Sequence, residues 1–320
     1  MSASSVVRVI YLAGAGRSGS TWLDTVLGAH PQVVAVGELS KLIPNGWLGA
    51  EYCACGKRAP DCPFWTEVRE RWLPAAPSSH LATLHAEQLA FERSRHWGRL
   101  LAERRSPSRR FERYREAMLG LYRAVAESAG RPVVVDSSKT PLRALALAGT
   151  PGLDLVVVHL VRDARGVAWS YRKSFARDEQ AGIQHDIAPQ GAGRTALAWI
   201  LVNLQTEWLR RLLPEGASLR LRYEELMRAP GCELGRLGNL AGLDLGGVAA
   251  ALERGQELPV GHTIAGNLLR MKGSVRLAPD FAWTSRLPPR ERAKVERLAG
   301  WMLAAYGYPR HAAGGEGEGL

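Results

Sequence analysis

Four short apolar runs stand out along the chain, at 6–12, 33–36, 133–135 and 153–161. They are rich in Val, Ile and Leu, and each is short enough to be a strand buried in a sheet. Residues 218–222 alternate between polar and apolar side chains, which indicates a fifth strand. Helical patterns, such as 195–213, lie between these segments. Strands that alternate with helices predict an α/β fold whose mostly parallel sheet is flanked by helices.

A glycine-rich turn, residues 14–19 with the sequence GAGRSG, directly follows the first apolar run. A helix is predicted to begin at Ser20 and to end before Pro31, which disfavours helical backbone in the residue that precedes it. The first backbone N–H groups of such a helix have no partners within it, and the helix dipole adds partial positive charge there. A strand, a glycine turn and a helix in this order therefore predict a phosphate-binding site.

Two motifs fit this turn, and the first is the dinucleotide-binding fingerprint. Gly14, Gly16 and Gly19 have its spacing, and Glu38 stands about twenty residues further on, where that motif places a ribose-binding acid. The glycine pattern alone therefore allows an NAD-dependent oxidoreductase.

The second motif is a P-loop that has lost its lysine. Ser20 occupies the position of that lysine, and a cation is found inside the turn instead, as Arg17. We expect Arg17, the backbone N–H groups and the hydroxyls of Ser18, Ser20 and Thr21 to hold an oxyanion rather than a magnesium triphosphate.

Composition narrows the class of partner. The 320 residues include 42 Lys and Arg against 31 Asp and Glu, a formal net charge of +11, which favours an anionic partner. No apolar run approaches the roughly 18 residues of a membrane span, and the start of the chain lacks the pattern of a signal peptide. We therefore expect a cytoplasmic protein without a membrane span.

Residues 67–130 have a helical pattern rich in arginine, with a break predicted at 104–110. An anion- or nucleic-acid-binding module is one interpretation of this charge. No aromatic stacking platform accompanies the arginines, and glutamates are interleaved with them, so we expect a solvated helical face rather than a nucleic-acid partner. We place the recognition of an acceptor in the region 41–130, and the arginines at 93–115 would suit an acidic one.

Three of the four cysteines lie close together, as Cys53, Cys55 and Cys62. A zinc site would need a fourth ligand, for which Cys232 or a histidine are the candidates, and the spacing is not that of a standard zinc finger. A disulfide is the second alternative. The interpretation we favour is reduced thiols in a loop.

The string 16–23, GRSGSTWL, resembles the 5′-phosphosulfate loop of sulfotransferases that use 3′-phosphoadenosine-5′-phosphosulfate (PAPS). Arg162 ends the fourth predicted strand and Ser170 follows eight residues later in a predicted helix. This pair resembles the motif with which these enzymes bind the 3′-phosphate of the nucleotide. The two motifs stand in the family's order, and each directly follows a strand.

The resemblance implies a P-loop nucleotide-binding-like sulfotransferase fold, with PAPS as the sulfuryl donor and 3′,5′-adenosine bisphosphate (PAP) as the product. Tyr223 resembles the tyrosine beside the adenine. Arg270 and Lys272 resemble the late basic loop that closes over the cofactor. The nucleotide-binding residues implied are Gly16, Arg17, Ser18, Gly19, Ser20, Thr21, Arg162, Ser170, Tyr223, Arg270 and Lys272.

Sulfuryl transfer needs a base for the acceptor hydroxyl and cations for the departing phosphate oxygen. Cytosolic sulfotransferases use a His, but His30 and His159 are poorly placed for this role. Gly37-Glu38 resembles the setting of the Glu base in carbohydrate and tyrosyl-protein sulfotransferases. We therefore predict Glu38 as the base, and Lys139 with Arg17 as the stabilising cations.

These predictions describe a metal-independent reaction in which a sulfuryl group passes to an acceptor hydroxyl. We expect residues 1–311 to form one domain and 312–320 to be a flexible tail. The sequence leaves the acceptor open among small molecules, carbohydrates and peptides, and it leaves the oligomeric state open.

Overall fold

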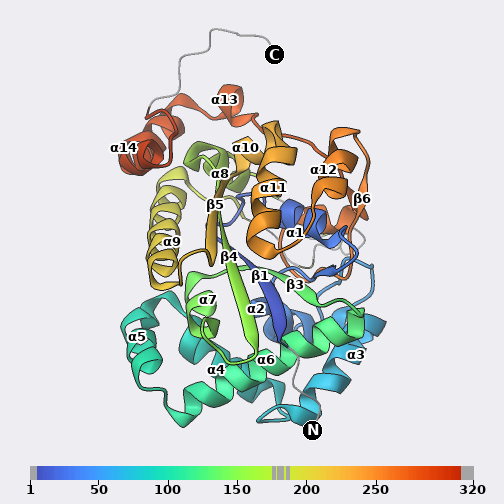
Figure 1. Cartoon of the computed structure of the whole chain (residues 1–320). Helices are drawn as coiled ribbons and strands as arrows, with labels where there is room; N and C mark the ends of the chain where they lie inside the picture. The colour runs from blue at the N-terminus through green and yellow to red at the C-terminus, as the bar shows by residue number, and fades with distance from the viewer. Residues whose placement is uncertain (1–5, 175–177, 179–183, 185–187, 311–320) are drawn as a thin grey trace.

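The computed structural model describes residues 6–174, 178, 184 and 188–310, so the predicted tail at 312–320 lies outside the described residues. A five-stranded sheet with the order β2-β3-β1-β4-β5 forms the centre, and every neighbouring pair in it is parallel (Figure 1). Its strands are β1 (Val7–Ala13), β2 (Val33–Ala35), β3 (Val133–Lys139), β4 (Leu153–Val161) and β5 (Ser218–Arg222). The predicted α/β class with a mostly parallel sheet is confirmed.

Helices cover both faces of this sheet. One face carries α4 (Leu81–Glu92), α6 (Arg109–Ala129) and α7 (Pro141–Leu147), and the other carries α1 (Ser20–Gly28), α10 (Tyr223–Arg228), α11 (Pro230–Ala241) and α12 (Gly246–Glu253). A third group, formed by α8 (Ala164–Tyr171), α9 (Ala192–Leu212) and α14 (Pro289–Ala305), packs beside the end of β4. The shorter or peripheral helices are α2 (Leu39–Lys41), α3 (Pro63–Trp72), α5 (Trp97–Arg105) and α13 (Trp283–Arg286).

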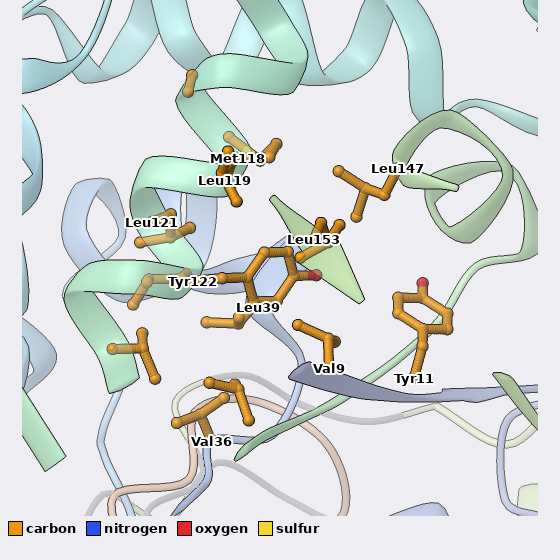
Figure 2. Close-up of a cluster of buried hydrophobic side chains, with 14 of the residues drawn as sticks. Val9, Tyr11, Val36, Leu39, Met118, Leu119, Leu121, Tyr122, Leu147 and Leu153 are labelled. Atoms are coloured by element: carbon orange, nitrogen blue, oxygen red, sulfur yellow. The ribbon is translucent and has the colours of Figure 1, made fainter. Parts of the chain in front are cut away.

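Successive side chains of β1 point to opposite faces of the sheet, and both faces are buried. Val9 and Tyr11 project toward α6, where Met118 and Tyr122 face the sheet (Figure 2). Ile10 and its neighbour Leu12 enter the core on the α1 side. Burial on both faces explains why the sequence of this strand is apolar without alternation.

Most arginines of the stretch 93–115 are exposed, as predicted for a solvated face, but two of them are half-buried and bind carbonyl groups. Arg104 donates hydrogen bonds to the carbonyls of Leu145 and Ala148, at 2.8 and 2.7 Å. Arg115 donates to the Ala148 carbonyl and to the hydroxyl of Thr150, at 2.8 Å each. Both arginines therefore satisfy carbonyl groups at the C-terminal end of α7, where cations are favourable. The predicted break is confirmed, since α5 ends at Arg105 and α6 begins at Arg109.

The segment after α12 returns to the central sheet. It contains a two-stranded antiparallel ribbon of β6 (Leu258–Pro259) and β7 (Ser274–Val275), with a short 3₁₀ segment, Leu268–Lys272, between them. Gly37 and Ile264 form a parallel bridge that brings the connection between β6 and β7 against the chain just after β2. We call residues 260–273 the late loop. Within the described residues, no helix is both long enough and apolar enough to cross a membrane.

Candidate active site

The loops that leave the carboxyl ends of the sheet surround a pocket of about 760 Å³. In open parallel sheets this edge is where ligands bind, beside the point at which the strand order reverses. Every predicted site residue except Ser18 and Arg270 lines the pocket. They are Gly16, Arg17, Gly19, Ser20, Thr21, Glu38, Lys139, Arg162, Ser170, Tyr223 and Lys272.

The glycine turn presents the N-terminus of α1 to the pocket. Gly19 precedes the helix with a left-handed φ of 92°, and no side chain caps the first N–H groups. A Cβ atom at Gly19 would lie 2.6 Å from the ring of Tyr223, so only glycine allows this close approach. The result is an uncapped helix N-terminus of the kind that binds anions.

Two of the predicted cations have a strained backbone. Arg17 and Lys139 both have positive φ, 66° and 67°, although neither is glycine. Such conformations cost of order 1–3 kcal/mol and are concentrated at functional sites. The strain turns both side chains toward the same pocket, where the Arg17 guanidinium lies 5.5 Å from the ring centre of Tyr171.

Glu38 and Lys139, which the sequence separates by about a hundred residues, form an ion pair on the pocket wall. The Lys139 ammonium donates to Oε1 of Glu38, and both side chains are less than a fifth exposed. The carboxylate that is predicted to be the base is therefore already in contact with one of the predicted cations.

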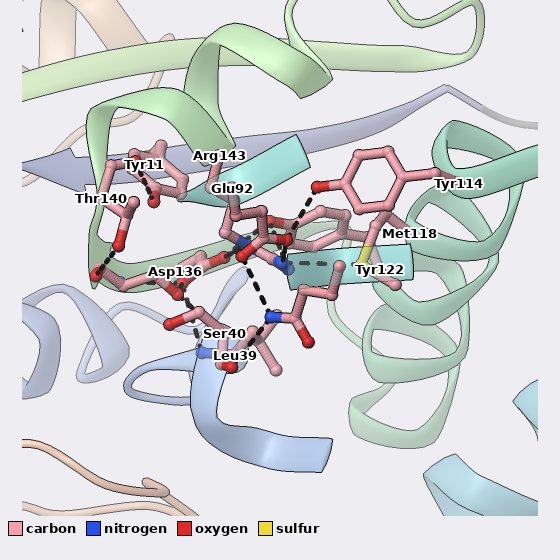
Figure 3. Close-up of polar contacts among 12 residues, drawn as sticks. Tyr11, Leu39, Ser40, Glu92, Tyr114, Met118, Tyr122, Asp136, Thr140 and Arg143 are labelled. Carbon is pink, nitrogen blue, oxygen red and sulfur yellow. Dashed lines mark hydrogen bonds and ion pairs between the residues drawn. The ribbon is translucent and has the colours of Figure 1, made fainter. Parts of the chain in front are cut away.

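Figure 3 shows a buried polar network that binds the residues next to this ion pair. Asp136, in the middle of β3, accepts hydrogen bonds from the backbone N–H groups of Leu39 and Ser138, the neighbours of the two paired residues. Its other oxygen accepts from the Tyr122 hydroxyl at 2.6 Å and from Nε of Arg143 at 3.2 Å. A single buried carboxylate thus fixes the backbone on both sides of the ion pair.

Arg143 is fully buried and also pairs with Glu92 of α4. Glu92 accepts hydrogen bonds from Tyr114 and from Gln88, whose amide also donates to the carbonyl of Ser40. Burial raises the pKa of Glu92, and the Arg143 guanidinium opposes that effect. Helices of the region 41–130 therefore support the site through this network, although they do not line the pocket.

Asp24 of α1 holds the late loop against the end of β2. One of its carboxylate oxygens accepts from the N–H of Gly37 at 3.2 Å, and the other lies 3.4 Å from the Thr263 hydroxyl. Complete burial raises the pKa of Asp24 to about 7. The N–H of Glu38 donates to the carbonyl of Ile264 at 3.0 Å, so the position of Glu38 depends on the late loop as well.

Arg162 lies at the opposite side of the pocket, where β4 ends. Its guanidinium donates to the carbonyl of Arg17 at 3.1 Å and lies 4.5 Å from the ring centre of Tyr223. It also pairs with Asp280, whose carboxylate lies 3.4 Å from Arg162 and 3.7 Å from Lys173. Two cations thus converge on one partly exposed carboxylate, which marks a second place for an anion.

The late loop closes the pocket over the α1 N-terminus. The N–H of Asn267 donates to the hydroxyl of Thr21 at 3.1 Å, and Lys272 lines the pocket. Arg270 lies outside the pocket wall and is almost fully buried, where it pairs with Glu51 at 2.7 Å. Its position fits an anchor for the loop better than the predicted contact with a nucleotide.

Nine residues of the pocket wall are not among the predicted site residues, and the two charged ones are Lys173 and Asp280. Nothing in their local sequence distinguishes them, because the sheet edge and the late loop bring them in from separate segments. Conversely, no residue of 41–130, all of which the structure describes, lines the pocket.

The chain is similar to known proteins in sequence and in fold. Residues 10–246 match the Sulfotransferase family. No curated protein sequence matches the chain. Two sulfotransferase domains are among the solved structures with a similar fold. The sulfotransferase domain of the Synechococcus PCC 7002 olefin synthase is 18% identical, with a TM-score of 0.51 over 96% of this chain and 97% of that one.

The second is the sulfotransferase domain from the curacin biosynthetic pathway, which is 16% identical, with a TM-score of 0.52 over 95% of this chain and 99% of that one. At these identities the two structures show a similarity of fold alone. The family match spans most of the chain and includes the glycine turn, both residues of the ion pair and Arg162. This chain belongs to the sulfotransferase family.

Proposed function

We propose that the protein transfers a sulfuryl group from PAPS to the hydroxyl of an acceptor, with Glu38 as the general base. The observation that carries this proposal is the Glu38–Lys139 ion pair on the wall of a pocket that also holds two separate anion-binding places. An uncapped helix N-terminus with Arg17 forms the first place, and Arg162 with Lys173 forms the second. A nucleotide that carries a 5′-phosphosulfate and a 3′-phosphate needs two such places.

The pocket fits such a nucleotide in size and chemistry. Its volume of about 760 Å³ lies within the range of roughly 300–1,000 Å³ for small-molecule sites. Gly16, Ser20 and Thr21 would hold the 5′ group together with the α1 N-terminus. Ser170 would join Arg162 at the 3′-phosphate. Tyr223 and Lys272 complete the wall around the nucleotide.

The reaction follows from the chain's own residues. Bound PAPS would supply an activated sulfuryl group on a phosphate leaving group. Glu38 accepts the proton of the acceptor hydroxyl as its oxygen attacks sulfur, and the bond between sulfur and the phosphate oxygen breaks. Lys139 and Arg17 stabilise the negative charge that this oxygen acquires. The strained backbone at both cations keeps them in place before the ligand binds.

The dinucleotide alternative has less support. It requires Glu38 to bind a ribose, whereas Glu38 is paired with Lys139 in the structure. It also gives the cluster of Arg162, Lys173 and Asp280 no role. Membership of the sulfotransferase family also favours sulfuryl transfer over the dinucleotide alternative.

Binding of PAP tests the proposal directly. PAP at a hundredfold excess over its dissociation constant should stabilise the purified protein by about 2.7 kcal/mol, because it binds only the folded state. Differential scanning calorimetry without added magnesium, with NAD and an oligonucleotide as parallel ligands, measures this. A rise in melting temperature with NAD but none with PAP contradicts the proposal.

A second prediction concerns the 3′-phosphate. Arg162→Ala should weaken PAP by about 10- to 150-fold, the value of one charge-assisted hydrogen bond. Adenosine 5′-phosphosulfate, which lacks the 3′-phosphate, should lose much less affinity. Isothermal titration with both ligands makes the comparison.

Asp280→Asn is the matched variant for this site. The amide keeps the Oδ1 atom that accepts from the N–H of Ala282 but removes the charge that competes with a phosphate for Arg162 and Lys173. PAP should bind up to about fivefold more tightly, since the Lys173–Asp280 ion pair is partly exposed and such a pair is worth up to about 1 kcal/mol. If Arg162→Ala weakened the binding of PAP and of adenosine 5′-phosphosulfate equally, Arg162 would have a structural role and would not bind the 3′-phosphate.

A further inference from the structure

We propose that Cys53, Cys55, Cys62 and His262 bind a structural zinc ion. The three thiols and the imidazole come from two segments about 200 residues apart, and their four ligand atoms all lie within 4.8 Å of one another. His262 is the fourth ligand that the sequence alone could not identify. Cys232 is not part of the cluster; it is exposed on α11.

The distances within the cluster suit a tetrahedral zinc site. Zinc binds sulfur at about 2.3 Å and imidazole nitrogen at about 2.0–2.1 Å, which places two ligand atoms of a tetrahedron about 3.6–3.8 Å apart. The Cys55 and Cys62 sulfurs are 3.6 Å apart. Nδ1 of His262 lies 3.7 Å from the Cys53 sulfur and 3.3 Å from the Cys62 sulfur. A disulfide needs two sulfurs at about 2.05 Å, so this geometry disfavours the disulfide alternative.

The surroundings of the cluster are also those of a metal site. The His262 ring stacks on Phe64, with ring centres 4.9 Å apart and an interplanar angle of 11°, which fixes the direction of Nδ1. Cys62 directly precedes α3, so the negative charge of a zinc-bound thiolate would lie at the N-terminus of that helix, where the helix dipole favours it.

The ligand set identifies both the metal and its role. Three cysteines and one histidine form a recurrent structural zinc site, in which the protein supplies all four ligands and no position remains for a substrate. The cluster also contributes no residue to the pocket wall. The zinc ion is therefore separate from the transfer reaction, which uses Glu38, Lys139 and Arg17.

The position of the site shows what the ion would hold together. The segment 51–62 contacts the late loop through the N–H of Ala54, which donates to the Thr263 carbonyl at 3.0 Å, and through the Glu51–Arg270 ion pair. The next residue, Ile264, pairs with the backbone of Val36 and Glu38. Zinc would thus fasten the late loop at His262, a few residues before Gly266 and Asn267 reach the pocket.

The experiment measures metal content and does not depend on sulfuryl transfer. The full chain, purified without chelators, should contain about one zinc ion per molecule by mass spectrometry of the elements. X-ray absorption at the zinc edge should give three sulfur neighbours and one nitrogen neighbour. Cys62→Ser and His262→Ala should lose most of the zinc, whereas Cys232→Ser, which removes an exposed thiol elsewhere, should keep it.

Cobalt substitution of the unaltered protein tests the metal site even if the variants fail to fold. Cobalt(II) in place of zinc should give the intense visible bands of a tetrahedral site and thiolate-to-metal charge-transfer bands. A protein that binds no zinc or cobalt stoichiometrically, or that contains a Cys55–Cys62 disulfide in mapped peptides, overturns the proposal. Because the zinc count needs no nucleotide, a metal-free protein that still binds PAP would refute this inference alone.

Discussion

Replacing Glu38 by Gln is expected to lower turnover by about 10²–10⁴-fold, the usual contribution of a general base. The amide has the size of the carboxylate but cannot accept the proton of the acceptor hydroxyl. The affinity for PAP should change little, because the proposed role of Glu38 is toward the acceptor. Turnover with an identified acceptor, together with calorimetric titration of PAP, measures both quantities.

Glu225→Gln is the matched control for this variant. Glu225 also pairs with a cation, Arg222, but it is half-exposed and lies outside the pocket wall. Its replacement should leave turnover unchanged. Near-normal turnover of Glu38→Gln would assign the base to another residue. Weakened binding of NAD together with unchanged turnover would instead support the dinucleotide alternative.

Replacing Arg143 by Ala is expected to destabilise the protein by about 3–5 kcal/mol, because it leaves the buried carboxylates of Glu92 and Asp136 without their cation (Figure 3). Urea unfolding followed by circular dichroism measures the change. The deficit should be smaller at about pH 5 than at about pH 8. Burial already raises the pKa of Glu92 in the folded protein. Without Arg143 the folded state favours the protonated acid further, so its stability falls as pH rises.

Arg110→Ala serves as the comparison, since Arg110 pairs with Glu87 on the surface of the same helical region. That exposed pair is worth about 1 kcal/mol or less. Similar losses for the two variants would mean that the buried network adds nothing to stability. A large loss for Arg143→Ala alone would show that the buried network stabilises the fold.

Local sequence patterns were enough to predict the sheet and the glycine turn that follows β1. The buried run 153–161 and the alternating segment 218–222 became β4 and β5 with the predicted bounds. The helix after the glycine turn also begins at Ser20 as predicted. These features depend on residues that are neighbours in the chain, so apolar runs, glycines and prolines indicate them directly.

Contacts between distant segments could not be predicted in this way. His262 joins the cysteines, Asp280 meets Arg162, and Arg270 turns to Glu51, each across more than a hundred residues. No periodicity or local motif encodes such a meeting; the fold has to bring the segments together. The supporting role of the region 41–130 was missed for the same reason, since its buried residues act through Arg143 and Asp136.

The position of the late loop in the sequence also affects the order in which parts of the chain can fold during synthesis. The hydrogen bonds that fix it to α1, from Asn267 to Thr21 and from Thr263 to Asp24, join residues 246 and 239 positions apart. During synthesis all five strands of the sheet leave the ribosome before any residue of this loop does. A nascent chain can therefore assemble its sheet while the pocket still lacks its cover. We therefore expect PAP to stabilise the finished protein without helping the early chain to fold.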